Sequence, residues 1–368
     1  MKWSLKLARL AGIDVFVHAT FPLLLIYVAW SYWQLTHSLG GVLRGVSLLL
    51  AVFLCVVLHE LGHALAARHY GIKTRDITLL PIGGIARLER MPRKPSQEFW
   101  VAVAGPAVNV VIALALFAGI YLGGKLAPMP HLIQARGSFL EQLLAINVWI
   151  VLFNLLPSFP MDGGRVLRAL LASRMPYENA TRIAASIGQF MALIFAFLGF
   201  TMPNLMLILI AVFVWISANQ ESNAADIQAG LQGVLVRDAM MTEFHALHLD
   251  DTLATAVTLT LAGSQHDFPV LDQYKFAGML TRKALMENLA LHGPRSPVAQ
   301  AMSREVPALQ THLSVEDAIH TLQSSDCESI PVFDQDRLVG LLTSENVGEL
   351  LLIRSSLKPS RDTSLLRR

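Results

Sequence analysis

Two histidines and a glutamate fall within one window of five residues inside a long apolar segment. His59, Glu60 and His63 form the pattern H-E-x-x-H inside an apolar run over 43–67. If this run is helical, positions i and i+4 lie on one face, so both imidazoles can bind one metal ion. Zn²⁺ accepts histidine nitrogens and, at catalytic sites, keeps a position open for water. Glu60 would then lie beside the ion, where it can take a proton from that water.

The apolar setting of this motif argues against a chance match. The pattern is expected by chance in about one chain in a hundred of this length. A charged side chain at the centre of a bilayer costs at least ~2.5–3.5 kcal/mol. Three polar residues so close together would be hard to retain at that depth without a partner such as a metal ion. The alternative is a helix end with interfacial histidines.

A third metal ligand is predicted in the segment over 154–165, which reads NLLPSFPMDGGR. Asp162 is its only acidic residue, and a carboxylate oxygen can complete a catalytic zinc site. Two prolines break the helix before Asp162 and two glycines follow it. Irregular backbone at membrane depth is tolerated where it is buried in protein or lines a cavity. The segment therefore fits a bend that directs Asp162 toward the histidines, although an ordinary turn at the cytoplasmic interface is the alternative.

Composition places these residues in a membrane protein. Of the 368 residues, 54% are hydrophobic and 15% are charged, whereas soluble domains have about 25% charged residues. A transmembrane helix needs about 20 apolar residues. Six segments qualify, which predicts a polytopic α-helical membrane protein with about six transmembrane helices: 16–33, 43–67, 99–124, 138–157, 183–201 and 203–219. A simple soluble enzyme is excluded, and a net charge of +2 gives no basis for nucleic-acid binding.

The basic residues predict the orientation. They gather before the first segment, between the second and third, and between the fourth and fifth. Cytoplasmic loops carry the excess of Lys and Arg. We therefore expect a multi-pass protein of the cell (inner) membrane with both termini cytoplasmic.

A short stretch after the motif helix differs from the spans. Residues 74–88 read TRDITLLPIGGIARL, which is rich in Ile, Thr and Leu with one Pro and two Gly. This composition predicts short strands at a bend, that is, a small β hairpin or sheet. An exposed strand edge can bind an extended peptide through main-chain hydrogen bonds. The hairpin is therefore a candidate for holding a substrate.

The chain after about residue 220 contains an internal repeat. One constant offset, without a gap, aligns the tripeptide FPV at 268–270 with IPV at 330–332, and GMLT at 278–281 with GLLT at 340–343. Each unit reads as strands with two helices, so a pair would bury each other's sheets. We expect a soluble α/β domain over 236–354 made of units 236–292 and 297–354. It follows a transmembrane domain over 1–222 and a linker over 223–235. Residues 355–368 read as a basic, disordered tail.

The motifs together resemble the site-2 protease family of intramembrane zinc metalloproteases. HELGH is followed by N-x-x-P-x-x-P-x-D-G from Asn154 on, and the run GPAVN at 105–109 and PIGG at 81–84 also look like family signatures. The resemblance implies one Zn²⁺ per chain with His59, His63 and Asp162 as ligands. It implies Glu60 as general base and Asn154 as a polar group near the scissile carbonyl.

The same resemblance implies a zinc metalloendopeptidase that cleaves transmembrane segments of substrate proteins near the cytoplasmic side of the bilayer. Single-span membrane proteins are the expected partners, such as anti-sigma factors, other membrane-tethered regulators and signal-peptide remnants. Two other functions stay open. One is a transporter or channel gated by its cytoplasmic domain, because intramembrane His and acidic groups also mark ion pathways. The other is a catalytically inactive relative.

The repeat resembles a tandem pair of CBS domains, which marks one subgroup of the protease family. Such pairs often bind adenine nucleotides with an Asp three residues after the Thr of G-h-h-T. Here those positions are Ala284 and Asn346, so nucleotide binding, with contacts from Thr281 or Thr343, is an open question. A dimerisation or docking module, including a homodimer through the CBS domains, is the alternative.

Two asparagines within the apolar segments are also notable. Asn109 and Asn147 lie in the third and fourth predicted spans. Polar side chains at such positions usually form hydrogen bonds to neighbouring helices. Asn109 has the better claim to a role at the site, because a Gly-Pro pair precedes it.

Overall fold

The computed structural model describes residues 4–81, 83–89, 92, 94–123, 137–325 and 327–357. The chain divides into two compact units, Met1–Ala225 and Asp226–Arg368, and each is described by itself. From residue 358 on, the predicted tail lies outside the described residues.

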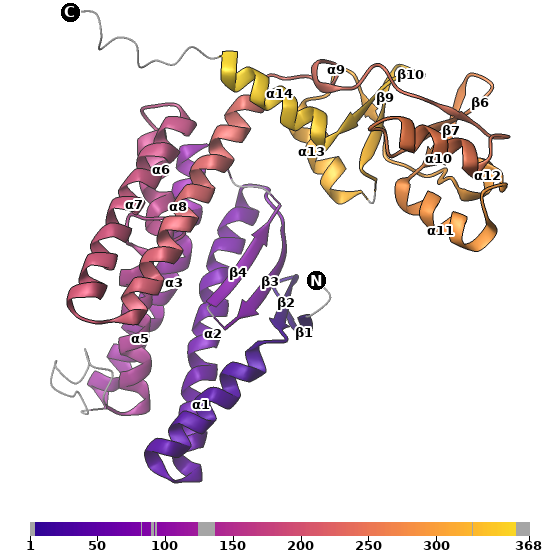
Figure 1. Ribbon diagram of the computed structural model, residues 1–368. Coiled ribbons are helices and arrows are strands. Elements are labelled where there is room, and N and C mark those ends of the chain that lie inside the picture. The colour runs from indigo at the N-terminus through magenta and orange to yellow at the C-terminus, as the bar shows by residue number, and fades with distance from the viewer. Residues whose placement is uncertain are drawn as a thin grey trace, which may run out of the picture. The chain divides into compact units, whose positions relative to one another are not determined.

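The first unit is mainly helical. Its helices are α1 (Phe21–Thr36), α2 (Leu39–His69), α3 (Pro95–Leu122), α5 (Phe139–Asn154), α6 (Asp162–Ala172), α7 (Tyr177–Thr201) and α8 (Leu205–Leu231), the last of which extends beyond residue 225 (Figure 1). Among the described residues, α2, α3, α7 and α8 are long and apolar enough to cross a membrane. About six transmembrane helices were predicted, but only these four meet the criteria of length and composition among the described residues.

The two remaining predicted spans are shorter in the structure. Helices α1 and α5 have 16 residues each, which at 1.5 Å per residue is ~24 Å of helix, less than a ~30 Å hydrocarbon core. In the fourth predicted span the helix ends at Asn154, and the residues up to Pro157 form the turn that precedes α6.

The prediction of a helix from residue 16 is wrong at its N-terminal end. Residues Ile13–His18 form strand β2, which pairs with β1 (Ser4–Leu10) in an antiparallel hairpin. Ala11 and Gly12 at its tip have φ of 50° and 86°, as two-residue hairpin turns require. The backbone of β2 pairs with the neighbouring strands, and its apolar side chains pack against the helices. This arrangement depends on tertiary contacts, which a hydropathy pattern does not reveal.

A four-stranded sheet lies beside the motif helix (Figure 1). Strands β3 (Thr74–Leu80) and β4 (Gly83–Leu88) form a hairpin, and the strand order is β1-β2-β3-β4 with β2 and β3 parallel. Val15, Ile77 and Leu79 of the sheet share one buried cluster with Phe53 and Val57 of α2. The burial of these side chains holds the sheet on α2 and leaves β4 as an edge strand within the described sheet.

The second unit contains the two repeats. The first consists of α9 (Val236–Ala239), β5 (Leu247–His248), α10 (Leu253–Ala262), β6 (Phe268–Asp272), β7 (Lys275–Leu280) and α11 (Arg282–His292). The second consists of α12 (Val298–Ala301), β8 (Leu309–Gln310), α13 (Val315–Ser324), β9 (Ser329–Asp334), β10 (Arg337–Thr343) and α14 (Ser344–Leu357).

The constant offset seen in the sequence relates the two repeats throughout this unit. The same offset separates the first residues of α9 and α12, of α10 and α13, and of β5 and β8. The bridge between Met279 and Ser303 has its counterpart, by that offset, in the bridge between Met241 and Leu341. Because each repeat contributes the same positions to these two bridges, the two repeats contact each other reciprocally.

Candidate metal centre

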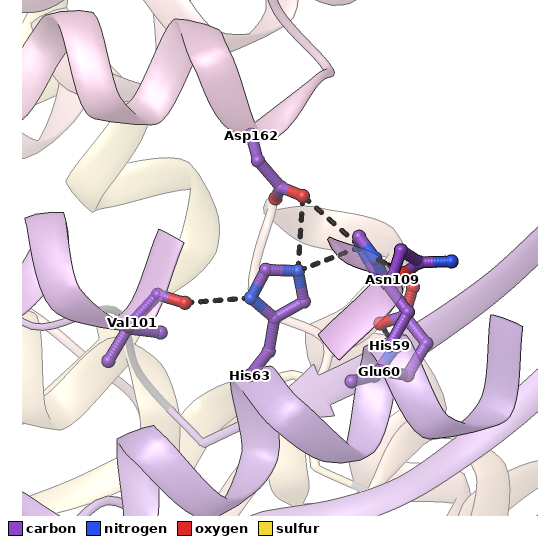
Figure 2. A network of polar contacts seen from close by, with 7 residues as sticks. His59, Glu60, His63, Val101, Asn109 and Asp162 are labelled. Carbon is purple, nitrogen blue, oxygen red and sulfur yellow. Dashed lines mark hydrogen bonds and ion pairs between the residues drawn. The ribbon is translucent and has the colours of Figure 1, made fainter. Parts of the chain in front are cut away.

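Three potential metal ligands converge between α2 and the start of α6. His59 Nε2 and His63 Nε2 lie 3.2 and 3.1 Å from Asp162 Oδ2, and 3.1 Å from each other. All three side chains are buried. Figure 2 shows Asp162 reaching both imidazoles from the side opposite α2. The structure thus brings together the three residues that the motifs suggested.

The opposite nitrogen of each imidazole is held by a neighbouring helix. His63 Nδ1 lies 2.7 Å from the backbone oxygen of Val101, and His59 Nδ1 lies 2.7 Å from Asn109 Oδ1, both on α3. An oxygen acceptor requires the proton on Nδ1, which leaves a lone pair on Nε2. Both Nε2 atoms are therefore available to a metal ion.

The donor set fits a zinc ion. When both imidazoles are neutral and carry their protons on Nδ1, neither Nε2 has a proton. Two nitrogen lone pairs and one carboxylate oxygen then face one another at 3.1–3.2 Å with no hydrogen bond between them. A cation among them relieves that repulsion. Ligands about 2.0–2.1 Å from a tetrahedral zinc ion lie ~3.3 Å apart, close to the observed separations. Two nitrogens and one carboxylate oxygen also form the usual ligand set of a catalytic zinc site.

Gly105 of α3 keeps the space at this centre clear. A Cβ atom at residue 105 would overlap His63 Nε2 and lie 2.7 Å from His59 Nε2. On the facing helix, a Cβ at Gly62 would lie 2.8 Å from the backbone oxygen of Ala104. The close approach of α2 and α3, and with it the position of both imidazoles, therefore depends on these two glycines.

A compact turn aims Asp162. Phe159, in the turn after α5, is fully buried, and Asp162 is the first residue of α6. A Cβ at Gly163 would lie 2.5 Å from the Leu155 backbone, and one at Gly164 would lie 2.6 Å from Ser158 C. Backbone atoms thus fill the space beside both glycines, which fixes the turn that presents Asp162 to the imidazoles.

A buried ion cluster ties α6 to its neighbours. Arg168 Nε lies 2.7 Å from Glu98 Oε1 on α3, and Arg168 Nη1 lies 2.8 Å from Glu221 Oε2 on α8. The Arg168 side chain is only 3% exposed and also lies over the ring of Phe159. Helix α3 supplies the hydrogen-bond partners of both imidazoles, and α6 begins with Asp162. The ion cluster between α3 and α6 therefore links the histidine side of the metal site to the aspartate side.

Glu60 lies at the edge of the centre, beside the sheet. Its Oε2 accepts a hydrogen bond of 3.1 Å from the backbone N–H of Ala86 on β4, and a Cβ at Gly84 would lie 2.8 Å from Glu60 Cγ. The strand therefore passes directly over this carboxylate. In Figure 2 Glu60 is next to His59 on α2.

Asn154 is less closely tied to the centre. It is the last residue of α5, is partly buried, and makes no side-chain hydrogen bond among the described residues. Sequence reasoning missed the contributions of Val101, Gly105 and Arg168. A glycine beside Pro106 in an apolar helix was a usable signal for Gly105, whereas Val101 contributes a backbone oxygen and Arg168 has no distinctive spacing.

The second unit has a separate cavity. It measures about 410 Å³ and is lined by residues of both repeats, among them Thr281, Lys283, Ser303 and Glu305. Thr281 Oγ1 accepts from the N–H of Ala284 and caps α11. Thr343, the equivalent residue of the second repeat, donates its hydroxyl to Asn346 Oδ1. Thr281 and Thr343 were the two possible nucleotide contacts in the sequence analysis, and of these Thr281 lines this cavity.

Each of the two units matches the model of a known protein family. The chain matches the model of peptidase family M50 over residues 47–135 and 131–195, and the CBS domain over 236–291 and 298–352. A zinc metalloprotease of Methanocaldococcus jannaschii is 32% identical over 285 residues, which cover 76% of this chain and 78% of that protein.

Two further similarities concern the first unit. Stage IV sporulation protein FB of Bacillus subtilis is 32% identical over 145 residues, which cover 39% of this chain and 47% of that protein. The solved structure of a site-2 protease from M. jannaschii has 36% identity and a TM-score of 0.44, and the match covers 60% of this chain and 95% of that one. With its zinc-type donor set, its apolar helices and its tandem CBS domains, this chain belongs to peptidase family M50, the site-2 protease family.

Proposed function

We propose that the protein is an intramembrane zinc metalloendopeptidase that hydrolyses peptide bonds in transmembrane segments of other proteins, near the cytoplasmic side of the membrane. The observation that carries this proposal is the convergence of Asp162 with His59 and His63. Both histidines, and Glu60 next to His59, lie on α2, a helix apolar enough to cross a bilayer. A transport site has no need for this arrangement. An inactive relative would have no use for a carboxylate beside an intact ligand set.

The chain's own residues divide the chemistry among them. His59, His63 and Asp162 would hold the ion, and bound zinc supplies a Lewis acid that polarises a carbonyl and makes water more acidic. Glu60 takes the proton of the attacking water and delivers it to the leaving amine. Asn154, at the end of α5, donates to the developing oxyanion. The buried setting strengthens each of these electrostatic interactions.

Metal removal tests the proposal directly. The full chain in detergent, with a single-span protein as substrate, should cleave it and contain close to one zinc ion per chain. A strong chelator should abolish cleavage, and added Zn²⁺ should restore it. Elemental analysis of each sample accompanies the assay. Cleavage by a metal-free preparation would contradict the proposal.

The edge of β4 is proposed to hold the substrate as an added strand. Ala86 directs its N–H away from β3 toward Glu60, and Glu89 directs its N–H to Lys73 on the other side. Successive residues of a strand alternate, so Leu88 also presents its N–H outward. A helical substrate segment must be extended before its peptide bonds are accessible, and main-chain bonds to this edge would hold it so.

Proline substitutions test this strand addition. Ala86→Pro and Leu88→Pro each remove one outward N–H, and proline is tolerated at such edge positions. We expect kcat/KM to fall about two- to twelvefold for each, since a hydrogen bond contributes about 0.5–1.5 kcal/mol. Ala86→Gly and Leu88→Val keep the N–H and serve as controls with little change. If Leu88→Pro, which leaves the contact with Glu60 intact, cleaves as fast as Leu88→Val, strand addition at this edge is wrong.

The expected surroundings follow from the same proposal. Single-span membrane proteins, such as anti-sigma factors, other tethered regulators or signal-peptide remnants, present one helix that can be extended at one end. The distribution of basic residues favours cytoplasmic termini in the cell (inner) membrane, with α1 and α5 completing six crossings together with the four longer helices. The domain limits predicted above are kept as proposals, with two changes: α8 continues through the predicted linker to Leu231, and α14 continues through the first residues of the predicted tail to Leu357.

The CBS pair is proposed to modulate this activity through a ligand in its cavity. A volume of about 410 Å³ lies within the range of small-molecule sites, and Lys283 offers a charge for a phosphate group. Adenine nucleotides are therefore the first ligands to test, despite Ala284 at the usual ribose-contact position. Calorimetric titration of the full chain with ATP and AMP should show saturable heat that Thr281→Val and Lys283→Met reduce. If neither nucleotide gives saturable heat, a docking or dimerisation role remains for the pair.

A further inference from the structure

A chain of buried amides leads away from the metal centre. Asn109 Oδ1 faces His59 Nδ1 at 2.7 Å, and Asn109 Nδ2 donates to Asn147 Oδ1 at 2.8 Å. Asn147 Nδ2 in turn donates to the backbone oxygen of Leu143 at 2.9 Å. Both asparagines are fully buried. The chain thus runs from the ligand helix α2 through α3 to α5.

The direction of every hydrogen bond in this chain follows from its far end. The Leu143 carbonyl can only accept, so Asn147 must present its NH₂ group there and its oxygen to Asn109. Asn109 must then give its NH₂ group to Asn147 and its oxygen to His59. An oxygen opposite Nδ1 requires the proton on Nδ1 and leaves the lone pair on Nε2, the atom that faces Asp162.

The two histidines differ in how secure this arrangement is. His63 Nδ1 faces the backbone oxygen of Val101, which cannot become a donor. His59 faces a side-chain amide, and an amide can turn over and present its NH₂ group instead. A turned Asn109 would favour the proton on His59 Nε2, which removes that nitrogen as a ligand. Asn147 opposes the turn, because its oxygen would then meet the oxygen of Asn109.

We propose that Asn147 is a positioning residue for metal binding, which acts through Asn109 to hold His59 in the tautomer with a free Nε2. This inference rests on the proposed zinc site but not on proteolysis, because it concerns the affinity for the metal alone. Partners of metal-bound histidines typically change metal affinity 10–100-fold when they are removed. Asn147 would be such a partner at one remove.

The test measures zinc affinity by competition with a chromophoric chelator, using the full chain in detergent. Asn147→Leu removes the acceptor for Asn109, and we expect zinc affinity to fall about 10–100-fold. Asn109→Asp replaces the amide by a carboxylate, which can only accept from His59. In that background the further change Asn147→Leu should not lower zinc affinity, because a carboxylate presents an oxygen to His59 in either orientation and Leu removes the Asn147 oxygen that would face it.

This rescue separates a tautomer effect from a packing effect. If Asn147 only packs α5 against α3, the loss caused by Asn147→Leu will persist in the Asn109→Asp background, and the inference is overturned. It is also overturned if Asn147→Leu binds zinc as tightly as the wild type. Should Asn147→Leu not fold, Asn147→Ser gives the same comparison, since its hydroxyl can still donate to Leu143 but is too short to meet Asn109.

The same experiment distinguishes this inference from the proposed function. A wild-type chain that binds no zinc contradicts the metal centre itself, and with it both proposals. A wild-type chain that binds zinc, and whose affinity is insensitive to Asn147, contradicts only the role given to the amide chain.

Discussion

Replacement of Glu60 by glutamine is expected to lower the rate of peptide cleavage by a factor of about 10²–10⁴, the usual contribution of a general base. Glutamine keeps the shape of the side chain, and its amide oxygen can still accept from the Ala86 N–H. It cannot take a proton from water at neutral pH. Because Glu60 is not among the three converging ligands, zinc should remain bound. The rate is measured under single-turnover conditions with a single-span substrate, beside the zinc content of the same sample.

The control is an exposed carboxylate at the end of the β3–β4 hairpin, one strand of which passes over Glu60. Glu89 follows the last residue of β4 and is exposed, so Glu89→Gln should leave both the rate and the zinc content unchanged. A Glu60→Gln enzyme that retains wild-type activity would remove Glu60 from the mechanism. Loss of zinc in that variant would instead show that Glu60 supports the metal.

Substitution of Gly105 by alanine should eliminate tight zinc binding. The added methyl group would overlap His63 Nε2 and lie 2.7 Å from His59 Nε2, and the contacts of both imidazoles with Val101 and Asn109 limit how far they can move aside. Overpacking of a closed site costs about 1–3 kcal/mol, occasionally more. We expect zinc affinity to fall by about two orders of magnitude, and cleavage to be lost with it. Competition with a chromophoric chelator measures the affinity.

The same helix offers a matched control. Gly119 also lies in α3, but a Cβ atom there would meet nothing within 4 Å. Gly119→Ala makes the same change in helix propensity, roughly 0.5–1 kcal/mol in favour of the helix, and should bind zinc like the wild type. Equal affinities of Gly105→Ala and Gly119→Ala would mean that α3 does not close the centre as the structure describes.

Much of the candidate site was predictable because it depends on short-range spacing. Residues four apart on a helix share a face whatever surrounds them, so His59 and His63 were predictable as a pair. Asp162 followed from the shortage of acidic residues in an apolar region and from the Pro and Gly around it. The role of each residue stays a prediction until zinc and cleavage are measured.

Other features could not be predicted, because they depend on which elements meet. The start of the first apolar segment became β2, since β1 and β3 pair with it on either side. The contact between Arg168 and Glu98 joins residues 70 positions apart. The direction of the amide chain depends on where the backbone of α5 presents one carbonyl oxygen.

The sequence by itself therefore determined the membrane class, the CBS repeat and the residues able to bind zinc, because composition, a constant repeat offset and helical spacing are local or additive properties. Only the tertiary structure decided that α3 supplies the partners of both imidazoles, that Gly105 leaves room for three ligands, and that β4 lies over Glu60. Those contacts arise from the packing of distant segments, in which a single methyl group or one carbonyl oxygen determines what can bind.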